Sequence, residues 1–590
     1  GLAGAANVQG QGGSTLGGSL PGVARVQGVP GNATPSASHK YLIETNPALT
    51  ELKQFLNSDY LLSGLGMNPD DSKKRLGDGL YEQRLIRDAV VARTGQRYID
   101  GLSSDEALFR YLMDNAIAYK DKLQLQLGVG LSAEQMAALT HDIVWLEEVE
   151  VNGEKVLAPV VYLAQAEGRL APNGALIQGR DVKLVSGGDL HNVGTLRARN
   201  DLSAAADNLD NSGLIEAGKR LDLLAGDSIR NRQGGVIAGR DVSLTALTGD
   251  VINERSVTRY DSALDGRTWE RSFADSAARV EAANSLNVQA GRDIANLGGV
   301  LQSRGDLSLD AGRDVTVAAV EDRQGQTRWS TSRLQSVTQL GAEVSAGRDL
   351  NVSAGRDLSA VASALEARRD IALSAGRDVT LAAAANEEHS FATGKKVTAK
   401  NDRVEHQSTV VSAGGDLSVQ GGNDVTFVAS QAKASNEAYL YAGNDLNLLA
   451  AHDESYSYYA KKKKGSLGRS SSRMSESETS TVVSSSIQAG QGAELVAKRD
   501  VNVEASSASS MKGELTVVAG RDVNLTAAAN SYSSASAKSK SGGLGLSSTS
   551  KANARSSSYT SVQGATLSGD TTVVQARRDI SVAASNVVSI

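Results

Sequence analysis

The stretch Ala311-Gly312-Arg313-Asp314-Val315-Thr316-Val317 carries the pattern that decides the fold: a small residue, Gly, Arg and Asp, then apolar and polar residues in alternation. Equivalent aspartates of successive copies lie 20 to 22 residues apart, as in Asp181 and Asp201 or Asp500 and Asp522. Alternation with period two predicts strands, and this repeat length is typical of one coil of a β-solenoid. Further Gly-Arg-Asp copies begin at Gly179, Gly239, Gly291, Gly347, Gly355, Gly376 and Gly520.

Several coils contain a second copy eight residues before the first, as in Asp306 and Asp314. We therefore expect at least two strands per coil, joined by corners where Gly tolerates positive φ and Asp bonds backbone N–H groups. Coils stacked in register should pair their Arg and Asp side chains in a charge-compensated ladder. At about 4.8 Å per coil, roughly 15 to 20 coils would span roughly 70 to 100 Å. The prediction is a mainly β protein built on a right-handed parallel β-helix.

The composition supports narrow, regular layers. The chain has 590 residues, with 60 Gly but 7 Pro, 5 Phe and 3 Trp, so small aliphatic side chains must fill its interior. The absence of Cys excludes disulfides, thiolate metal sites and a cysteine nucleophile. The formal net charge of -6, spread over 61 basic and 67 acidic residues, argues against nucleic acid as a partner.

The chain begins at Gly1 in a Gly-rich stretch, without a signal peptide or an apolar run that could span a bilayer. We expect it to be an internal fragment of a longer protein. Four parts are predicted: the end of an earlier coil with a linker, a small, mainly α-helical module, regular coils, and coils with long excursions. Their ranges are 1–40, 41–163, 164–257 and 258–590.

The helical module breaks the repeat and carries helix signals. Asn46-Pro47 predicts the start of a first helix, and a second is expected from Lys73 to Arg93. Capping boxes at Ser103-Ser104-Asp105-Glu106 and Ser132-Ala133-Glu134-Gln135 predict two more helices. The Asn152-Gly153 turn predicts a closing β-hairpin.

Polar excursions rich in Ser, Thr and Lys interrupt the later coils. Their centres contain Gly, as in Lys464-Gly465-Ser466-Leu467-Gly468, and their flanks alternate polar with small residues. This pattern favours long β-hairpins that project from the rod, and disordered loops are the alternative. The excursions are expected at 323–338, 387–408, 455–486 and 531–558.

The repeats and excursions together resemble the hemagglutinin repeats of filamentous-hemagglutinin and CdiA-type exoproteins of two-partner secretion. The module resembles that family's mid-chain region, so the resemblance covers nearly all of residues 41–590. The matching segments are Tyr41-Leu42-Ile43-Glu44-Thr45-Asn46-Pro47, Ser58-Asp59-Tyr60, Lys74-Arg75-Leu76-Gly77-Asp78-Gly79-Leu80-Tyr81-Glu82-Gln83-Arg84-Leu85-Ile86 and Asp142-Ile143-Val144-Trp145-Leu146.

The resemblance implies a secreted protein of the bacterial cell surface, exported through an outer-membrane partner transporter. It implies an extended stalk for cell-cell contact and toxin delivery in contact-dependent growth inhibition. The partners it implies are a target-cell outer-membrane receptor and, for the later repeats, an outer membrane. Two alternatives stay open: a host-directed adhesin that binds glycan or protein receptors, and a polysaccharide-active β-helix enzyme. The enzyme would need clustered carboxylates in a groove, whereas the acids here belong to the repeat.

Two stretches are candidate binding sites. Arg304-Gly305-Asp306 is an integrin-type tripeptide, but its Asp keeps the spacing of the corner aspartates, which favours a structural role. The run Lys461, Lys462, Lys463, Lys464 could bind phosphate-rich glycans, lipopolysaccharide or heparin-like chains, or form a solvated hairpin tip. No catalytic, metal or cofactor residues are predicted, because the 6 His lack the spacing of a zinc site.

Overall fold

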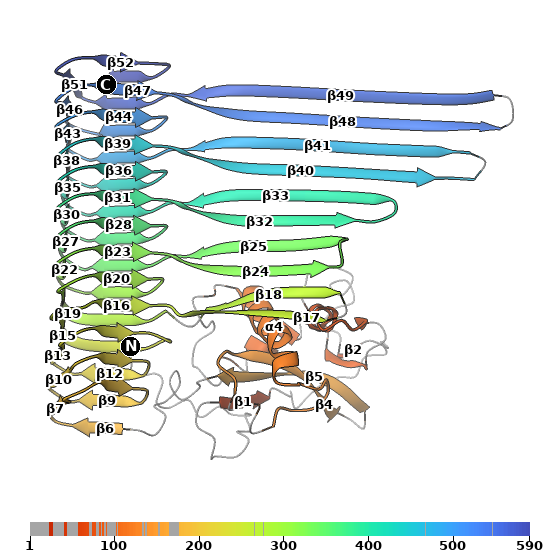
Figure 1. The fold of residues 1–590 in the computed structure, drawn as a ribbon, viewed down its shortest axis with the longest axis horizontal. Helices are drawn as coiled ribbons and strands as arrows, with labels where there is room; N and C mark the ends of the chain where they lie inside the picture. The colour runs from red at the N-terminus through yellow and green to blue at the C-terminus, as the bar shows by residue number, and fades with distance from the viewer. Residues whose placement is uncertain are drawn as a thin grey trace.

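A parallel β-helix runs through the computed structural model, and a sheet of long hairpins projects from one of its corners (Figure 1). The prediction of a mainly β protein built on a parallel β-helix with hairpin excursions is therefore confirmed. The structure describes residues 23–27, 41–43, 57–69, 73–77, 82–83, 85–87, 90, 102, 104–132, 135, 138–151, 154–164, 176–264, 266–274, 277–466, 468–544 and 547–590.

Each coil contributes strands to three faces, which follow one another along the chain. The first face contains β7 (Val182–Val185), β10 (Leu202–Ala206), β13 (Arg220–Ala225), the later parts of β15 (Val236–Ala246) and β19 (Arg279–Ala290), β22 (Leu307–Ala311), β27 (Leu350–Ala354), β30 (Ile371–Ala375), β35 (Leu417–Gly421), β38 (Glu437–Ala442), β43 (Gly492–Ala497), β46 (Glu514–Ala519) and β51 (Thr571–Ala576).

The second face is a 13-stranded sheet. It contains β8 (Leu190–Asn192), β11 (Leu209–Asn211), β14 (Ile229–Asn231), β16 (Val251–Glu254), β20 (Ile294–Leu297), β23 (Val315–Ala318), β28 (Leu358–Val361), β31 (Val379–Ala382), β36 (Val425–Val428), β39 (Leu446–Leu449), β44 (Val501–Glu504), β47 (Val523–Thr526) and β52 (Ile580–Val582).

The third face joins the first in a 25-stranded sheet, because β15 and β19 each run through the corner between them. It contains β6 (Leu176–Gly179), β9 (Thr195–Ala198), β12 (Leu214–Ala217), the early parts of β15 and β19, β21 (Val300–Ser303), β26 (Glu343–Ala346), β29 (Ala364–Ala367), β34 (Val410–Ala413), β37 (Gln431–Ala434), β42 (Ser486–Ala489), β45 (Ser507–Ser510), β50 (Thr566–Gly569) and β53 (Asn586–Ser589).

The rod is shorter than expected from the repeat count. Within the described residues, the second face has one strand per coil and 13 strands, which gives a length of about 60 Å at ~4.8 Å per coil. The expectation of roughly 15 to 20 coils was wrong, because the hairpins take up much of the chain between coils.

Small aliphatic side chains fill the rod. In β22, Leu307 and Leu309 point inward and are 0% and 1% exposed, whereas Ser308 between them is not buried. They lie in parallel register with Leu350 and Val352 of the next coil. The same stacking continues along the rod in one hydrophobic cluster from Val182 to Leu567. Because each layer buries its apolar side chains against the next, the core is continuous along the rod.

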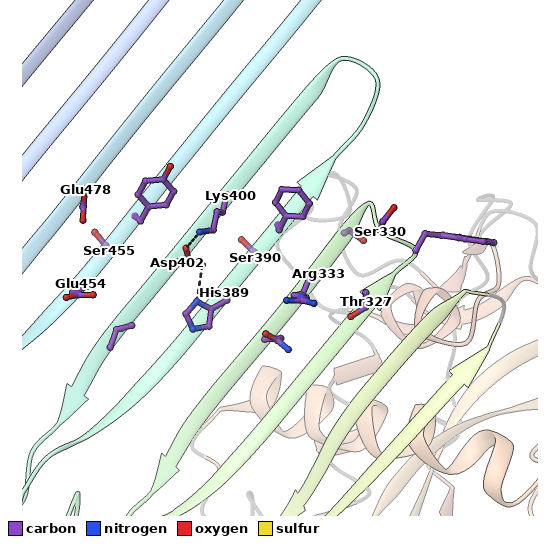
Figure 2. A pocket seen from close by; sticks show the side chains of 16 residues that line it. Thr327, Ser330, Arg333, His389, Ser390, Lys400, Asp402, Glu454, Ser455 and Glu478 are labelled. Carbon is purple, nitrogen blue, oxygen red and sulfur yellow. Dashed lines mark hydrogen bonds and ion pairs between the residues drawn. The ribbon is translucent and has the colours of Figure 1, made fainter.

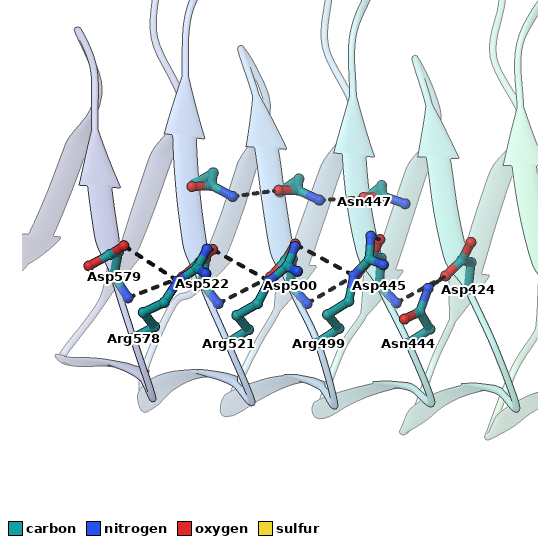
Figure 3. A network of polar contacts seen from close by, with 12 residues as sticks. Asp424, Asn444, Asp445, Asn447, Arg499, Asp500, Arg521, Asp522, Arg578 and Asp579 are labelled. Carbon is teal, nitrogen blue, oxygen red and sulfur yellow. Dashed lines mark hydrogen bonds and ion pairs between the residues drawn. The ribbon is translucent and has the colours of Figure 1, made fainter.

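The corner before the second face carries the predicted ladder of aspartates and arginines (Figure 3). Arg521 Nε donates to Asp500 Oδ1 at 2.9 Å, and the same oxygen accepts the backbone N–H of Asp522 at 3.2 Å. The hydrogen bond from Arg521 holds the pKa of Asp500 below its ordinary value. Asn423 and Asn444 replace the arginine at two rungs and donate to Asp378 and Asp424, each at 2.9 Å.

A buried asparagine ladder marks the first coils. Asn231 Nδ2 donates to Asn253 Oδ1 at 2.9 Å, and Asn231 Oδ1 accepts from Asn211 at 2.9 Å. The ladder begins at Asn192 and ends at Asn296, because the residue in register with Asn296 in the next coil is Val317. In the later coils, Ser or Thr side chains at the corner after the second face make the buried hydrogen bonds instead. For example, the backbone N–H of Ser430 donates to Ser485 Oγ at 3.2 Å. The two stretches of coils therefore differ in their interior chemistry.

Hairpins leave the rod at the end of the second face in alternate coils (Figure 1). The intervening coils turn this corner with a residue of positive φ, such as Ala362 at 48° or Ala429 at 46°. The hairpin strands are β17 (Val257–Leu264) and β18 (Arg267–Ala274), β24 (Val320–Arg328) and β25 (Ser332–Leu340), β32 (Ala384–Thr393) and β33 (Val397–Gln407), β40 (Ala451–Lys464) and β41 (Ser470–Val483), and β48 (Ala528–Leu544) and β49 (Ser547–Gln563).

The hairpins pair with one another in a single 10-stranded antiparallel sheet, the projecting sheet. Two coils rise by about 9.6 Å, which is also the width of the two strands of one hairpin. A hairpin in every second coil therefore brings each hairpin beside the next at hydrogen-bonding distance. The first hairpin, β17 and β18, was missed in the sequence because its residues lack the Ser-rich and Lys-rich signature.

The module contains a 5-stranded sheet as well as helices. Its strands are β1 (Val23–Gln27), β2 (Tyr41–Ile43), β3 (Arg75–Gly77), β4 (Ile143–Val151) and β5 (Glu154–Ala164). β4 and β5 form the predicted hairpin, with Val151 opposite Glu154. β1 pairs with β5, so its residues belong to this sheet and not to an earlier coil.

The described helices of the module are α2 (Ser58–Gly64) and α4 (Asp105–Lys122). Ser104 caps α4 and accepts from Ala107 N at 3.0 Å, and Ser132 and Gln135 form the other predicted capping box. The helix expected from Lys73 was wrong at its start, because residues 75–77 pair as strand β3, although residues 82–83, 85–87 and 90 are helical. The helix expected at Asn46-Pro47 lies outside the described residues.

Candidate functional site

The projecting sheet brings together side chains that are far apart in the chain. Residues directly opposite each other in antiparallel strands point to the same face. One such row crosses five strands on one face. Its residues are Gln335, His389, Asp402, Tyr456 and Glu478.

An open groove of about 970 Å³ follows this row (Figure 2). Aromatic side chains are spread along it: Trp329 and Phe391 are 64% and 36% exposed, and Tyr456 is partly buried. We call it the aromatic groove. Its lining is Thr327, Trp329, Ser330, Ser332, Arg333, Gln335, His389, Ser390, Phe391, Lys400, Asp402, Val404, Glu454, Ser455, Tyr456 and Glu478.

A polar network fixes the centre of the aromatic groove. Asp402 Oδ1 lies 2.9 Å from His389 Nδ1, and Asp402 Oδ2 lies 2.7 Å from Lys400 Nζ. Lys400 Nζ lies 5.0 Å above the ring of Tyr456, whose hydroxyl donates to Glu476 at 2.9 Å. Because Asp402 and Glu476 are already paired, the network can orient the aromatic rings and offer hydrogen bonds to a polar ligand.

These contacts shift the pKa values of His389 and Asp402 in opposite directions. The hydrogen bond to Asp402 raises the pKa of His389 above its ordinary value, against the effect of partial burial. For Asp402, partial burial opposes ionisation, but hydrogen bonds from Lys400 and His389 outweigh it and lower its pKa. The imidazolium and carboxylate forms therefore favour each other.

We expect the imidazole of His389 to titrate above 6.5, and Asp402→Asn to lower its pKa. Since the folded-state pKa is raised, the stabilisation is fully present below 6.5 and is lost as pH rises through the folded-state pKa. Side-chain NMR of His389 measures both values. The matched control is Asp453→Asn, which removes the carboxylate 2.9 Å from His406 in the same sheet. A His389 pKa that is unchanged in Asp402→Asn would contradict this assignment.

The predicted lysine run lies at the outer end of β40. Lys463 and Lys464 border a separate groove of about 890 Å³ at the hairpin tips, together with Arg469, Lys540 and Lys551. The sequence could indicate Lys463 and Lys464, and Arg469 follows them in the turn of the same hairpin. It could not indicate Lys540 and Lys551, because the next hairpin brings them there. Tyr456 lies in the aromatic groove and not in this one.

The tripeptide Arg304-Gly305-Asp306 lies at the corner between β21 and β22. Asp306 Oδ1 accepts the backbone N–H of Asp349 at 3.1 Å, as an aspartate of the corner ladder does. A Cβ on Gly305 would lie 2.1 Å from Asn284 O of the preceding coil. The glycine and the carboxylate therefore both serve the stacking of coils.

Within the described residues, no group of His, Asp and Glu side chains could hold a metal ion. In the same residues, no helix combines the length and apolarity of a membrane span.

Comparison with known proteins identifies the later coils. The family model described as "Hemagglutinin repeat" matches residues 324–400, 390–466 and 465–588, which contain the hairpins after the first except for the first four residues of β24. No solved structure matches the chain.

Curated relatives match over most of the chain. The 16S rRNA endonuclease CdiA of Enterobacter cloacae is 33% identical over 84% of the chain and 15% of its own length. The deoxyribonuclease CdiA of Dickeya dadantii is 35% identical over 79% of the chain and 14% of its own length. The tRNA nuclease CdiA of Escherichia coli strain STEC_O31 is 34% identical over 82% of the chain. The chain thus spans about 15% of the length of these relatives.

Proposed function

Because the chain belongs to the hemagglutinin-repeat family of CdiA-type exoproteins of contact-dependent growth inhibition, which are secreted to the bacterial cell surface, we propose that it forms a non-catalytic stalk for cell-cell contact and toxin delivery. Its partners would be an outer-membrane two-partner transporter on the producing cell and an outer-membrane receptor on the target cell. The later repeats would associate with the target's outer membrane.

The observation that carries this proposal is the continuity of the rod. One hydrophobic cluster extends from Val182 to Leu567 without a break. The coils are bonded on three faces, and the projecting sheet links alternate coils a second time. Because bending would break contacts on several faces at once, the rod is suited to hold its ends apart.

An in-register deletion tests the stalk role. Glu343 and Val410 occupy the same position of their coils, so removal of residues 343–409 takes out whole coils and one complete hairpin. In a full-length CdiA-type protein that contains this chain, we expect surface display and growth inhibition of target cells to persist. The coils on either side of the deletion can stack on each other, and the hairpins on either side can pair in the projecting sheet.

A core disruption provides the matched control. Leu365 is 1% exposed, and Leu365→Asp places a charge inside the rod while removing no residue. We expect it to abolish display and growth inhibition. Loss of growth inhibition in the deletion variant with normal display would refute a purely mechanical role for this part.

The aromatic groove supports a second candidate, a host-directed adhesin for glycans. Exposed rings beside paired carboxylates suit the faces and hydroxyls of sugars. The same deletion separates the two candidates, because it removes His389, Phe391 and Asp402 from the groove. An adhesin would then lose attachment to host cells while its surface display continued.

A further inference from the structure

The outer part of the projecting sheet has one strongly cationic face. β40, β41, β48 and β49 lie side by side there, so their opposed residues form rows. One row is Lys463, Ser471, Lys540 and Lys551, the next is Lys461, Arg473, Lys538 and Asn553, and the third is Tyr459, Ser475, Ser536 and Arg555. We call the basic side chains of these rows the cationic platform.

No acid neutralises the cationic platform. The next two rows toward the rod, on the same face, contain Ser, Thr and Tyr. Of the acids of these strands, Glu454, Glu476 and Glu478 occupy positions of the opposite face. Asp453 is on the platform's face, but it lies three rows nearer the rod than Tyr459 and pairs with His406 at 2.9 Å. None of the platform's basic side chains makes an ion pair within the described residues.

This arrangement costs stability in the absence of a ligand. Lys540 and Lys551 are directly opposite each other, and like charges in that position repel. Both are exposed. The arginines of the corner ladder, such as Arg313 and Arg521, are paired with acids, whereas no acid offsets the repulsion between Lys540 and Lys551. A bound anionic ligand would offset it.

The spacing of the platform suits a polymer with several anionic groups. Neighbouring cations are about 4.8 Å apart across strands and about 7 Å apart along a strand. Serine hydroxyls such as those of Ser471 and Ser536 lie between them and can donate to phosphate oxygens. The tip groove of about 890 Å³ adds Arg469, whose fork-shaped guanidinium matches phosphate geometry.

We propose that the cationic platform binds a glycan that carries several phosphate groups. Sugar rings can stack on Tyr532 and Tyr559, which oppose each other on the same face and are 44% and 67% exposed. The surrounding Ser, Thr and Asn side chains match sugar hydroxyls. This site goes beyond the stalk function, and it lies on the opposite face from the aromatic groove.

Binding of purified lipopolysaccharide with a phosphorylated core to the full chain tests the proposal. The variant Lys463→Gln, Lys538→Gln, Lys540→Gln, Lys551→Gln should bind on the order of tenfold more weakly or worse. The control Lys183→Gln, Lys219→Gln, Lys433→Gln, Lys498→Gln removes the same charge from exposed positions on the coils and should bind like the unmodified chain. Chemical removal of the phosphates should weaken binding to the unmodified chain by a similar factor.

Other ligands define the outcomes that overturn the proposal. Equal binding before and after dephosphorylation, or equal losses in both variants, would show that the platform does not recognise phosphate. Tighter binding to phosphatidylglycerol vesicles, heparin or duplex DNA would assign the platform to a bilayer, a sulfated chain or a nucleic acid instead. The assay measures no growth inhibition, so its failure is distinct from failure of the stalk proposal.

Discussion

Replacing Trp269 with Ala is expected to detach the module from the first hairpin. Trp269 belongs to β18, is 4% exposed and packs in the hydrophobic cluster of the module, whose other members all lie between Leu61 and Ala164. Removal of a buried Trp side chain typically costs about 3 to 5 kcal/mol. Hydrogen exchange of the α4 amides should report this loss as faster opening of the module.

Two further variants check the interpretation. Trp269→Phe keeps most of the apolar contact, and it loses no hydrogen bond because the indole Nε1 has no partner within the described residues. It should restore most of the protection. Arg267→Gln removes the bond from Nη1 to Ser63 O at 3.0 Å, which is exposed and should cost little. Unchanged exchange in Trp269→Ala would show that the module is held by other contacts.

Replacing Asn231 with Leu is expected to open the first coils. Asn231 is 1% exposed, and its amide donates to Gly235 O, Asn253 Oδ1 and Arg279 O at 2.9 to 3.1 Å. A leucine of similar size takes the donor away from Asn253 Oδ1, while Gly235 O keeps the backbone N–H of Arg279 at 3.0 Å. Asn211 loses one acceptor but keeps its bonds to Gly213 O and Val236 O. With about 1 to 3 kcal/mol for one orphaned buried group and about 1 kcal/mol for the other lost bonds, the local cost should reach about 2 to 4 kcal/mol.

The outward-facing ladder of Asn447, Asn502 and Asn524 provides the control (Figure 3). Asn502→Leu removes the same type of side-chain bond, but water can replace it, so the cost should stay below about 1 kcal/mol. Hydrogen exchange of β11, β14 and β16 measures the first variant, and that of β39, β44 and β47 the second. Equal losses of stability in Asn231→Leu and Asn502→Leu would contradict the idea that burial makes the asparagine hydrogen bonds of the first coils important.

Much of the rod could be predicted because the residues that specify each coil lie within one repeat of the sequence. The Gly-Arg-Asp unit sits at corners, and the alternation after it, as in Val315 and Val317, places apolar side chains inward. The later hairpins were also readable, since their strands alternate over many residues. The alternative of disordered loops is wrong for these segments, because they pair along their length.

The candidate sites could be predicted only in part. The lysine run at Lys461 was visible, but Lys540 and Lys551 join it from a hairpin about 80 residues later. The aromatic groove was not foreseen, because Trp329, His389 and Tyr456 come from three hairpins. Nothing in the sequence around Trp269 indicates that its ring completes the core of the module.

The sequence by itself determined the coil, the corner ladder and the polar hairpin strands, because each depends on residues within one repeat. The tertiary structure alone decided that hairpins in alternate coils join in one sheet, since the rise of two coils equals the width of two strands. That match places residues of different repeats in common rows. It thereby gives the projecting sheet its two chemically different faces, one aromatic with paired charges and one cationic.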